Sequence, residues 1–208
     1  MGEEVLFQGA EAVLVKTVWK NRLVVEKRRA SKKYRLEEID SMLISQRTRD
    51  EARLIASARA AGVCVPVVYD VDMRRGVLVL EFVEGIRVKE YLGSLESEGQ
   101  RKLCSSIGSC VALLHNGGVV HGDLTTSNMI FSKAERIVFI DFGLGAKSED
   151  VESFGVDLHV LMEAFESTHS EFEQCFEWVL EGYERCFAGD AEVVRKKIEQ
   201  IVRRGRYR

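Results

Sequence analysis

The hydrophobic pattern of this 208-residue chain changes near Glu84-Gly85, and this change limits the folds open to it. Short apolar runs separated by polar or glycine-containing breaks come first, at 12–15, 23–25 and 77–80. Such runs are typical of strands in an antiparallel sheet. After Glu84-Gly85, apolar residues recur with helical spacing, over 103–114 and again over 172–183. Strands followed by helices predict an α+β fold in which a small sheet lobe precedes a mainly helical lobe.

One main helix is expected inside the sheet lobe. Residues 37–61 carry apolar side chains with helical spacing and are followed by Gly62, a residue type that commonly ends a helix. We therefore place the sheet lobe at residues 1–84 and the helical lobe at residues 85–208, which together form one domain.

Composition excludes several classes of protein. Hydrophobic residues make up 46% and charged residues 30% of the chain, a balance typical of a folded globular domain. No run of about 18 apolar residues occurs, and the start, Met1-Gly2-Glu3-Glu4, lacks the basic residues of a secretory signal. We expect a soluble protein without membrane contact, located in the cytoplasm, with the nucleus left open. The five cysteines form no C-x-x-C pair and the four histidines no H-E-x-x-H, which argues against a disulfide framework and a zinc site.

Charge is distributed unevenly, although the formal net charge is only −3. Residues 16–35 carry nine Lys or Arg against one Glu, whereas residues 145–192 carry thirteen Asp or Glu against two basic residues. The chain then ends in a basic tail, with four arginines in residues 203–208 around Gly205. We expect this tail to be flexible and to contact nucleic acid or an acidic partner.

Two short segments carry the chemistry. His121 to Asn128 reads H-G-D-L-T-T-S-N, and Asp141-Phe142-Gly143 follows two strand-like runs at 129–131 and 137–140. In this order and spacing they are the H-x-D-x-x-x-x-N and D-F-G motifs of phosphotransferases related to protein kinases. Phosphoryl transfer requires a carboxylate that orients the nucleophile and oxygen ligands that hold Mg²⁺. We expect Asp123 to take the first role and Asn128 and Asp141 to bind the metal.

A phosphotransferase of this kind also needs groups earlier in the chain. Lys27, at the end of a predicted strand, and Glu51, in the predicted helix, are placed to form the ion pair that contacts the α/β-phosphates of ATP. Residues 80–85 then become a hinge segment. Backbone groups of Glu81 to Val83 would bind adenine, and Leu80 would flank its pocket.

Further segments make a family resemblance specific. They are Gly9-Ala10-Glu11-Ala12, Lys27-x-Arg29, Arg47 to Arg53, His121 to Asn128, Asp141 to Leu144, Val156-Asp157-Leu158, Glu166 to His169 and Arg204-Gly205-Arg206. From about Gln8 to its last residue, the chain resembles the PRPK family of small atypical kinases, which form a subunit of the KEOPS (EKC) complex. The resemblance implies a bilobal protein-kinase-like fold and a Ser/Thr kinase or ATPase that uses ATP and Mg²⁺. It further implies a role in making threonylcarbamoyladenosine on tRNA. The implied partners are the transferase subunit and other KEOPS subunits, with tRNA reached through the complex and the basic tail.

Some features depart from ordinary protein kinases. Gly9 and Glu11 are assigned to nucleotide binding, but Gly9-Ala10-Glu11-Ala12 offers one glycine where a Gly-rich loop has three. Gly122 stands where an arginine usually receives an activation-loop phosphate, and no A-P-E motif follows. Thr125 replaces a lysine that is usual in Ser/Thr kinases. Turnover of ATP within a complex therefore fits better than efficient phosphorylation of peptides.

Two alternatives stay open. A small-molecule phosphotransferase of the aminoglycoside-kinase type also carries a His-Gly-Asp segment, although only about 65 residues follow Asp141-Phe142-Gly143 to build an acceptor pocket. A non-catalytic scaffold that senses nucleotide is the second alternative. The intact set of Lys27, Glu51, Asp123, Asn128 and Asp141 argues against it.

Overall fold

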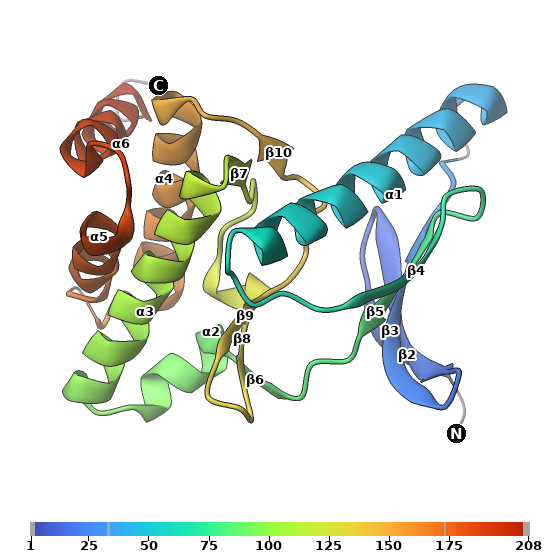
Figure 1. The fold of residues 1–208 in the computed structure, drawn as a ribbon, viewed down its shortest axis with the longest axis horizontal. Coiled ribbons are helices and arrows are strands. Elements are labelled where there is room, and N and C mark those ends of the chain that lie inside the picture. The colour runs from blue at the N-terminus through green and yellow to red at the C-terminus, as the bar shows by residue number, and fades with distance from the viewer. Residues whose placement is uncertain (1–2, 33, 173, 206–208) are drawn as a thin grey trace. The chain divides into compact units, whose positions relative to one another are not determined.

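The computed structural model describes residues 3–32, 34–172 and 174–205 (Figure 1). The chain has an α+β fold, as the change in its hydrophobic pattern predicts. It divides into two compact units. The N-terminal unit comprises residues 1–56 and 66–83, and the C-terminal unit comprises residues 57–65 and 84–208.

An antiparallel sheet forms the core of the N-terminal unit. Its strands are β1 (Glu4–Gln8), β2 (Ala12–Trp19), β3 (Arg22–Arg29), β4 (Val68–Asp72) and β5 (Val77–Glu81), in the order β1-β2-β3-β5-β4. Lys20 and Asn21 both have positive φ and join β2 to β3 in a tight hairpin. Strand β3 is therefore central, with Lys27 paired to Leu14 of β2 on one side and Leu78 of β5 on the other.

Helix α1 (Glu37–Ala60) follows β3 and confirms the predicted helix. Its start is fixed by Asp40, whose buried carboxylate accepts hydrogen bonds from the Lys32 backbone N–H at 3.0 Å and from Arg35 at 3.3 Å. Its end is fixed by Gly62, which has φ of +90°.

Helix α3 (Ser97–Asn116) is the central helix of the C-terminal unit, and α5 (Cys175–Cys186) packs closely against it. Glycines make this approach possible. A Cβ atom on Gly108 would lie 1.8 Å from the Val179 carbonyl oxygen, and one on Gly182 would lie 2.0 Å from that of Ser105. The two backbones therefore meet where no other residue type fits.

Two further helices, α4 (Val151–Thr168) and α6 (Ala191–Gly205), were not predicted from the sequence. They are joined by ion pairs from Lys197 and Arg204 to Glu152, at 2.7 and 3.1 Å. The predicted flexibility at Gly205 is wrong for the first part of the basic tail, because α6 continues through Gly205. Residues 206–208 of the tail lie outside the described residues.

Short elements frame the two motif segments. They are β6 (Gly85–Arg87), α2 (Val88–Tyr91), η1 (Leu92–Ser94), β7 (Val119–Val120), η2 (Thr126–Asn128), β8 (Met129–Ser132), β9 (Ile137–Phe139) and β10 (Ala146–Lys147). Strands β6, β8 and β9 form one small sheet, and β7 pairs with β10. The strand-like runs predicted on either side of residues 132–136 are confirmed as β8 and β9.

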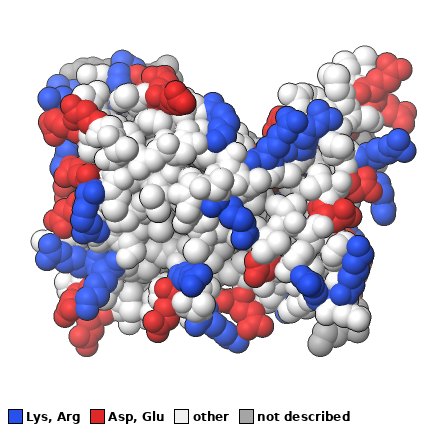
Figure 2. Space-filling model, in the orientation of Figure 1, with Lys and Arg blue, Asp and Glu red and all other residues white. Residues whose placement is uncertain are grey.

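The blocks of opposite charge in the sequence meet in the folded C-terminal unit. Arg195 of α6 is paired with Glu177 and Glu184 of α5, and Figure 2 shows acidic and basic side chains alternating along the left edge of the molecule. All five cysteines are free thiols in the structure. Among the described residues, no helix combines the length and apolar content that crossing a membrane requires.

Candidate functional site

In the N-terminal unit, the structure pairs Lys27 of β3 with Glu51 of α1. The Lys27 Nζ atom lies 2.7 Å from Glu51 Oε1, and the two side chains are 8% and 1% exposed. A second cation reaches the same carboxylate, because Arg29 Nη2 lies 2.5 Å from Glu51 Oε2. Residues 27 and 29 share one face of β3, since side chains alternate along a strand. Arg29 was named from the sequence only within the Lys27-x-Arg29 segment of the family resemblance and was given no role, although the spacing of two residues indicates a shared face of the strand.

These three side chains form a buried charged cluster. Burying a charge is unfavourable unless it is paired, and Glu51 pairs with both Lys27 and Arg29. The ammonium group of Lys27 and the guanidinium group of Arg29 are donors of the kind that bind an anionic ligand such as a phosphate group.

The turn between β1 and β2 holds Gly9 and Glu11. The Gly9 N–H donates to the Ala12 carbonyl oxygen at 3.0 Å, which closes the turn. The Glu11 carboxylate accepts a hydrogen bond of 2.6 Å from Arg47 of α1, and this bond lowers the pKa of Glu11. This short turn is tied to α1 by one exposed ion pair.

The hinge residues lie at the end of β5. Leu80 is 9% exposed and belongs to the core of the N-terminal unit. The Glu81 N–H donates to the Val67 carbonyl oxygen at 2.8 Å, while its carboxylate accepts from the Val67 N–H at 3.0 Å. The N–H of Glu81 is therefore used within the sheet. Val83 lies just beyond β5 and is half-buried.

In the C-terminal unit, Asp123 and Asn128 are brought together by their own loop. The Asn128 Nδ2 group donates to the Asp123 carboxylate at 2.8 Å and to the Asp123 carbonyl oxygen at 2.9 Å. Helix η2 supplies the bend that returns Asn128 to Asp123. Both of these hydrogen bonds use Nδ2, so neither of them uses the amide oxygen of Asn128.

Asp157 of α4 anchors this loop. Its carboxylate is fully buried and accepts hydrogen bonds from the backbone N–H groups of His121, at 2.8 Å, and Gly122, at 2.9 Å. His115 Nε2 lies 3.3 Å from the same carboxylate. Burial acts to raise the pKa of Asp157, but the contacts with His115 and His121 outweigh it and hold the pKa below its ordinary value. Asp157 was named from the sequence only within the Val156-Asp157-Leu158 segment of the family resemblance, because this role depends on a contact across 35 residues.

His121 connects the loop to the Asp141-Phe142-Gly143 segment. Its Nε2 atom is 3.1 Å from the Ile140 carbonyl oxygen and so carries the proton, while Nδ1 accepts the Asp123 N–H at 3.3 Å. Its ring centroid lies 4.6 Å from that of the buried Phe142. Burial lowers the pKa of His121, so the neutral ring is favoured.

Backbone conformation explains two residue types in these segments. Gly122 has φ of +78°, and a Cβ atom there would lie 2.1 Å from the Leu144 carbonyl oxygen. An arginine at this position, as in ordinary protein kinases, would not fit. Asp141 also has positive φ, +62°, and its carboxylate accepts the Gly143 N–H at 3.2 Å.

The residues expected to bind Mg²⁺ suit that ion. An amide oxygen from Asn128 and a carboxylate from Asp141 are hard oxygen donors, which Mg²⁺ prefers. Within the described parts of the chain, no group of three or more His, Cys, Asp or Glu residues is placed to hold a metal. Two protein ligands suit a Mg²⁺ ion that also binds substrate phosphates and water.

A lysine paired with a helix glutamate, together with the Asp123–Asn128 loop and the segment at Asp141, defines a kinase-like protein. Residues 8–175 match the family described as RIO domain, and the chain belongs to this kinase-like family. It is 46% identical to the KEOPS complex subunit Bud32 of Pyrococcus abyssi over 187 residues, which are 89% of this chain and 84% of that protein. The family resemblance found in the sequence is thereby confirmed.

Longer relatives contain a segment similar to this chain. The chain is 45% identical over 205 residues to a protein of Methanothermobacter thermautotrophicus named "Probable bifunctional tRNA threonylcarbamoyladenosine biosynthesis protein". A protein of the same name from Methanosarcina mazei is 40% identical over 205 residues. These matches cover 98% of this chain but only 36% of each relative, so the chain spans about a third of their length.

Proposed function

We propose that this chain is an ATP- and Mg²⁺-dependent phosphotransferase, an atypical Ser/Thr kinase or ATPase. The observation that carries the proposal is the buried ion pair of Lys27 with Glu51, at 2.7 Å, in a chain that also hydrogen-bonds Asn128 to Asp123. The Lys27–Glu51 ion pair suits phosphate binding, and the hydrogen-bonded Asp123 and Asn128 suit the positioning of a nucleophile and a metal.

Each of these side chains has a distinct role in the proposed reaction. Lys27 binds the α/β-phosphates, and Glu51 holds its ammonium group in place. Asp123 accepts a hydrogen bond from the attacking hydroxyl or water and orients it toward the γ-phosphate. Asn128 and Asp141 hold Mg²⁺, which neutralises charge on the phosphates when bound.

The rest of the nucleotide would be bound by the N-terminal unit. Leu80 supplies an apolar surface for adenine, and the backbone of Glu81 to Val83 supplies hydrogen bonds. The N–H of Glu81 is not available for this purpose, because it donates to the Val67 carbonyl oxygen. Gly9 and Glu11 would lie over the phosphates without a Gly-rich loop. Glu11 brings a negative charge, so its pairing with Arg47 favours phosphate binding by offsetting that charge.

We further propose that the chain acts in the cytoplasm as a KEOPS subunit in the threonylcarbamoyladenosine modification of tRNA. The names of its relatives support this assignment, and Pyrococcus abyssi Bud32 matches over most of its length. The expected partners are the transferase subunit, the other subunits of the complex and tRNA. Thr125, which stands in place of the usual kinase lysine, favours ATP turnover in the complex over peptide phosphorylation.

The test is ATP turnover by the full chain, alone and with the transferase subunit and tRNA. Asp123→Ala should lower kcat by roughly 10²–10⁴-fold while nucleotide still binds, because orientation of the nucleophile is lost. Asp141→Ala should instead weaken Mg²⁺-dependent nucleotide binding, measured by calorimetry with and without Mg²⁺. Wild-type turnover in either variant would show that these roles are wrong.

The same assay separates the alternatives. A scaffold that only senses nucleotide would bind ATP without hydrolysing it under any condition. A small-molecule phosphotransferase would turn over ATP only with a low-molecular-weight hydroxyl acceptor and would not respond to the transferase subunit or tRNA.

A further inference from the structure

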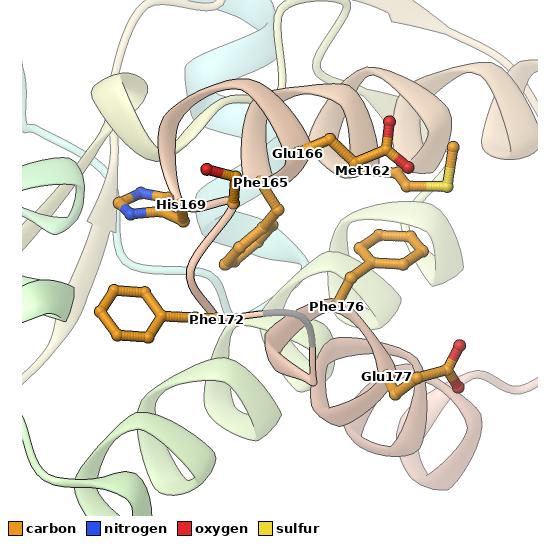
Figure 3. A pocket seen from close by; sticks show the side chains of 8 residues that line it. Met162, Phe165, Glu166, His169, Phe172, Phe176 and Glu177 are labelled. Carbon is orange, nitrogen blue, oxygen red and sulfur yellow. The ribbon is translucent and has the colours of Figure 1, made fainter.

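A pocket of about 360 Å³ lies in the C-terminal unit, between the end of α4 and the start of α5 (Figure 3). Its apolar wall is formed by Met162, Phe165, Phe172 and Phe176. The ring centroids of Phe165 and Phe176 are 6.4 Å apart, and both rings point into the space between the helices. The pocket therefore offers aromatic surface to a bound group.

Acidic side chains stand at the edge of this pocket. Glu166 of α4 and Glu177 of α5 line it, and both are exposed. Arg195 of α6 pairs with Glu177, and Glu166 is the second acidic side chain of the lining. Burial lowers the pKa of His169, the remaining titratable residue of the lining, so this ring is neutral near pH 7. Lys89 also lowers the pKa of His169, so a positive charge lies on that side of the pocket, and the acidic edge formed by Glu166 and Glu177 is the part that favours a cation.

Aromatic rings beside a carboxylate suit a guanidinium group in particular. A guanidinium stacks on ring faces, is more weakly hydrated than an ammonium, and forms two parallel hydrogen bonds with a carboxylate. The chain's own Arg204 is not the occupant, because it binds Glu152 in the first turn of α4 while the pocket lies at the last turn. The 18 residues of α4 separate these ends by roughly 27 Å.

The pocket is also connected to the loop that carries Asn128. His169 Nε2 lies 3.1 Å from Thr126 Oγ1, and both residues are buried. Thr126 begins η2, which ends at Asn128. A group bound against His169 is therefore one hydrogen bond away from the segment assigned to metal binding.

We propose that this pocket binds an arginine side chain presented by a partner protein. The aliphatic part of the arginine packs on Met162 and Phe165, its guanidinium stacks on Phe176, and Glu166 accepts its hydrogen bonds. The proposal goes beyond the proposed function and does not depend on it, because binding requires no catalysis.

The test is a nuclear magnetic resonance titration of the isotope-labelled full chain with short peptides. The probe is a blocked pentapeptide with a central arginine between alanines, and its matched control carries citrulline, which has nearly the same shape without the charge. The arginine peptide should shift the signals of His169, Phe172 and Phe176, and it should bind about fivefold or more tightly than the citrulline peptide.

A pair of variants locates the binding. Glu166→Gln should remove most of the preference for arginine over citrulline. Glu181→Gln, on the exposed surface of α5 outside the pocket, should keep it. Equal binding of the two peptides, signal shifts confined to other residues, or an unchanged preference in Glu166→Gln would overturn the proposal. ATP turnover is not a readout, so failure of the proposed function leaves this test valid.

Discussion

At the scale of single residues, the site depends on charges whose partners are fixed by burial. Glu51 is 1% exposed and holds Lys27 and Arg29, whereas Glu11 makes its ion pair with Arg47 at the surface. Both pairs attach α1 to the sheet or to the β1–β2 turn. Their energetic weight differs, because solvent screens the exposed pair and leaves the buried cluster unscreened.

Substitution of these two glutamates should separate the two cases. Glu51→Gln removes the buried carboxylate that Lys27 and Arg29 share, so we expect the free energy of unfolding to fall by about 3 kcal/mol or more. Glu11→Gln removes an exposed pair and should cost less than about 1 kcal/mol. Urea denaturation of both variants measures these values, and losses of equal size would contradict the expected ranking.

His121 gives the stability of the chain a pH dependence. Burial holds the pKa of the folded His121 below its ordinary value of about 6.5, so the unfolded chain binds a proton first as the pH falls. Its contribution to stability is full above about pH 6.5 and decreases as the pH falls toward the folded pKa. In urea denaturation between about pH 7.5 and 5.5, His121→Asn should reduce the slope of unfolding free energy by up to about 1.4 kcal/mol per pH unit. A slope unchanged by the substitution would show that His121 is not its source.

At the scale of elements, the sequence pattern predicted the helices and strands whose apolar spacing and end signals lie within a short stretch of the chain. Strands β2, β3 and β5 and helix α1 were predicted because their apolar residues and the terminating Gly62 lie within short windows of the chain. Helix α4 was missed although its buried Phe154, Leu158, Leu161 and Phe165 follow helical spacing, a signal present in the sequence.

The parts of the site that could not be predicted involve contacts between distant segments. Lys27 and Glu51 follow from motif spacing, and the structure pairs them. The anchoring of His121 and Gly122 by Asp157 requires α4 to pack beside the loop, and no local pattern encodes that contact. The same holds for the close packing of α3 on α5, where glycine in a helix would otherwise indicate only a weaker helix.

Alanine substitutions in α3 test that packing. Gly108→Ala places a Cβ atom against the Val179 backbone of α5, so we expect a loss of about 2–3 kcal/mol in the free energy of unfolding. The matched control is Gly99→Ala in the same helix. Its Cβ atom would meet only the side chain of Leu95, at 3.3 Å, and the better helix propensity of alanine should offset this contact to within about 1 kcal/mol. Thermal or urea unfolding that ranks the two variants in the opposite order would contradict the packing argument.

At the scale of the whole molecule, the charge blocks of the sequence serve two purposes. Arg195, Lys197 and Arg204 of α6 are paired with glutamates of α4 and α5, so this part of the basic stretch stabilises the C-terminal unit. A pattern of charge along the chain does not show which blocks will meet. The predicted contact of the basic tail with a partner therefore no longer rests on Arg204, and Arg206 and Arg208 lie outside the described residues.

Removal of residues 206–208 tests whether the end of the chain contacts tRNA. The truncated chain keeps Arg204 and its ion pair with Glu152, so its stability and basal ATP turnover should match those of the full chain. If the last arginines contact tRNA phosphates, stimulation by tRNA should fall, and the slope of log affinity against log salt should decrease in magnitude by roughly 1–2. The control is Arg204→Gln in the full chain, which should lower stability by less than about 1 kcal/mol and leave the salt slope nearly unchanged. Equal tRNA stimulation of the truncated and full-length chains across a salt series would show that the end of the chain does not contact tRNA. The reason is that the loss of two positive charges at a phosphate contact must weaken the salt dependence of binding.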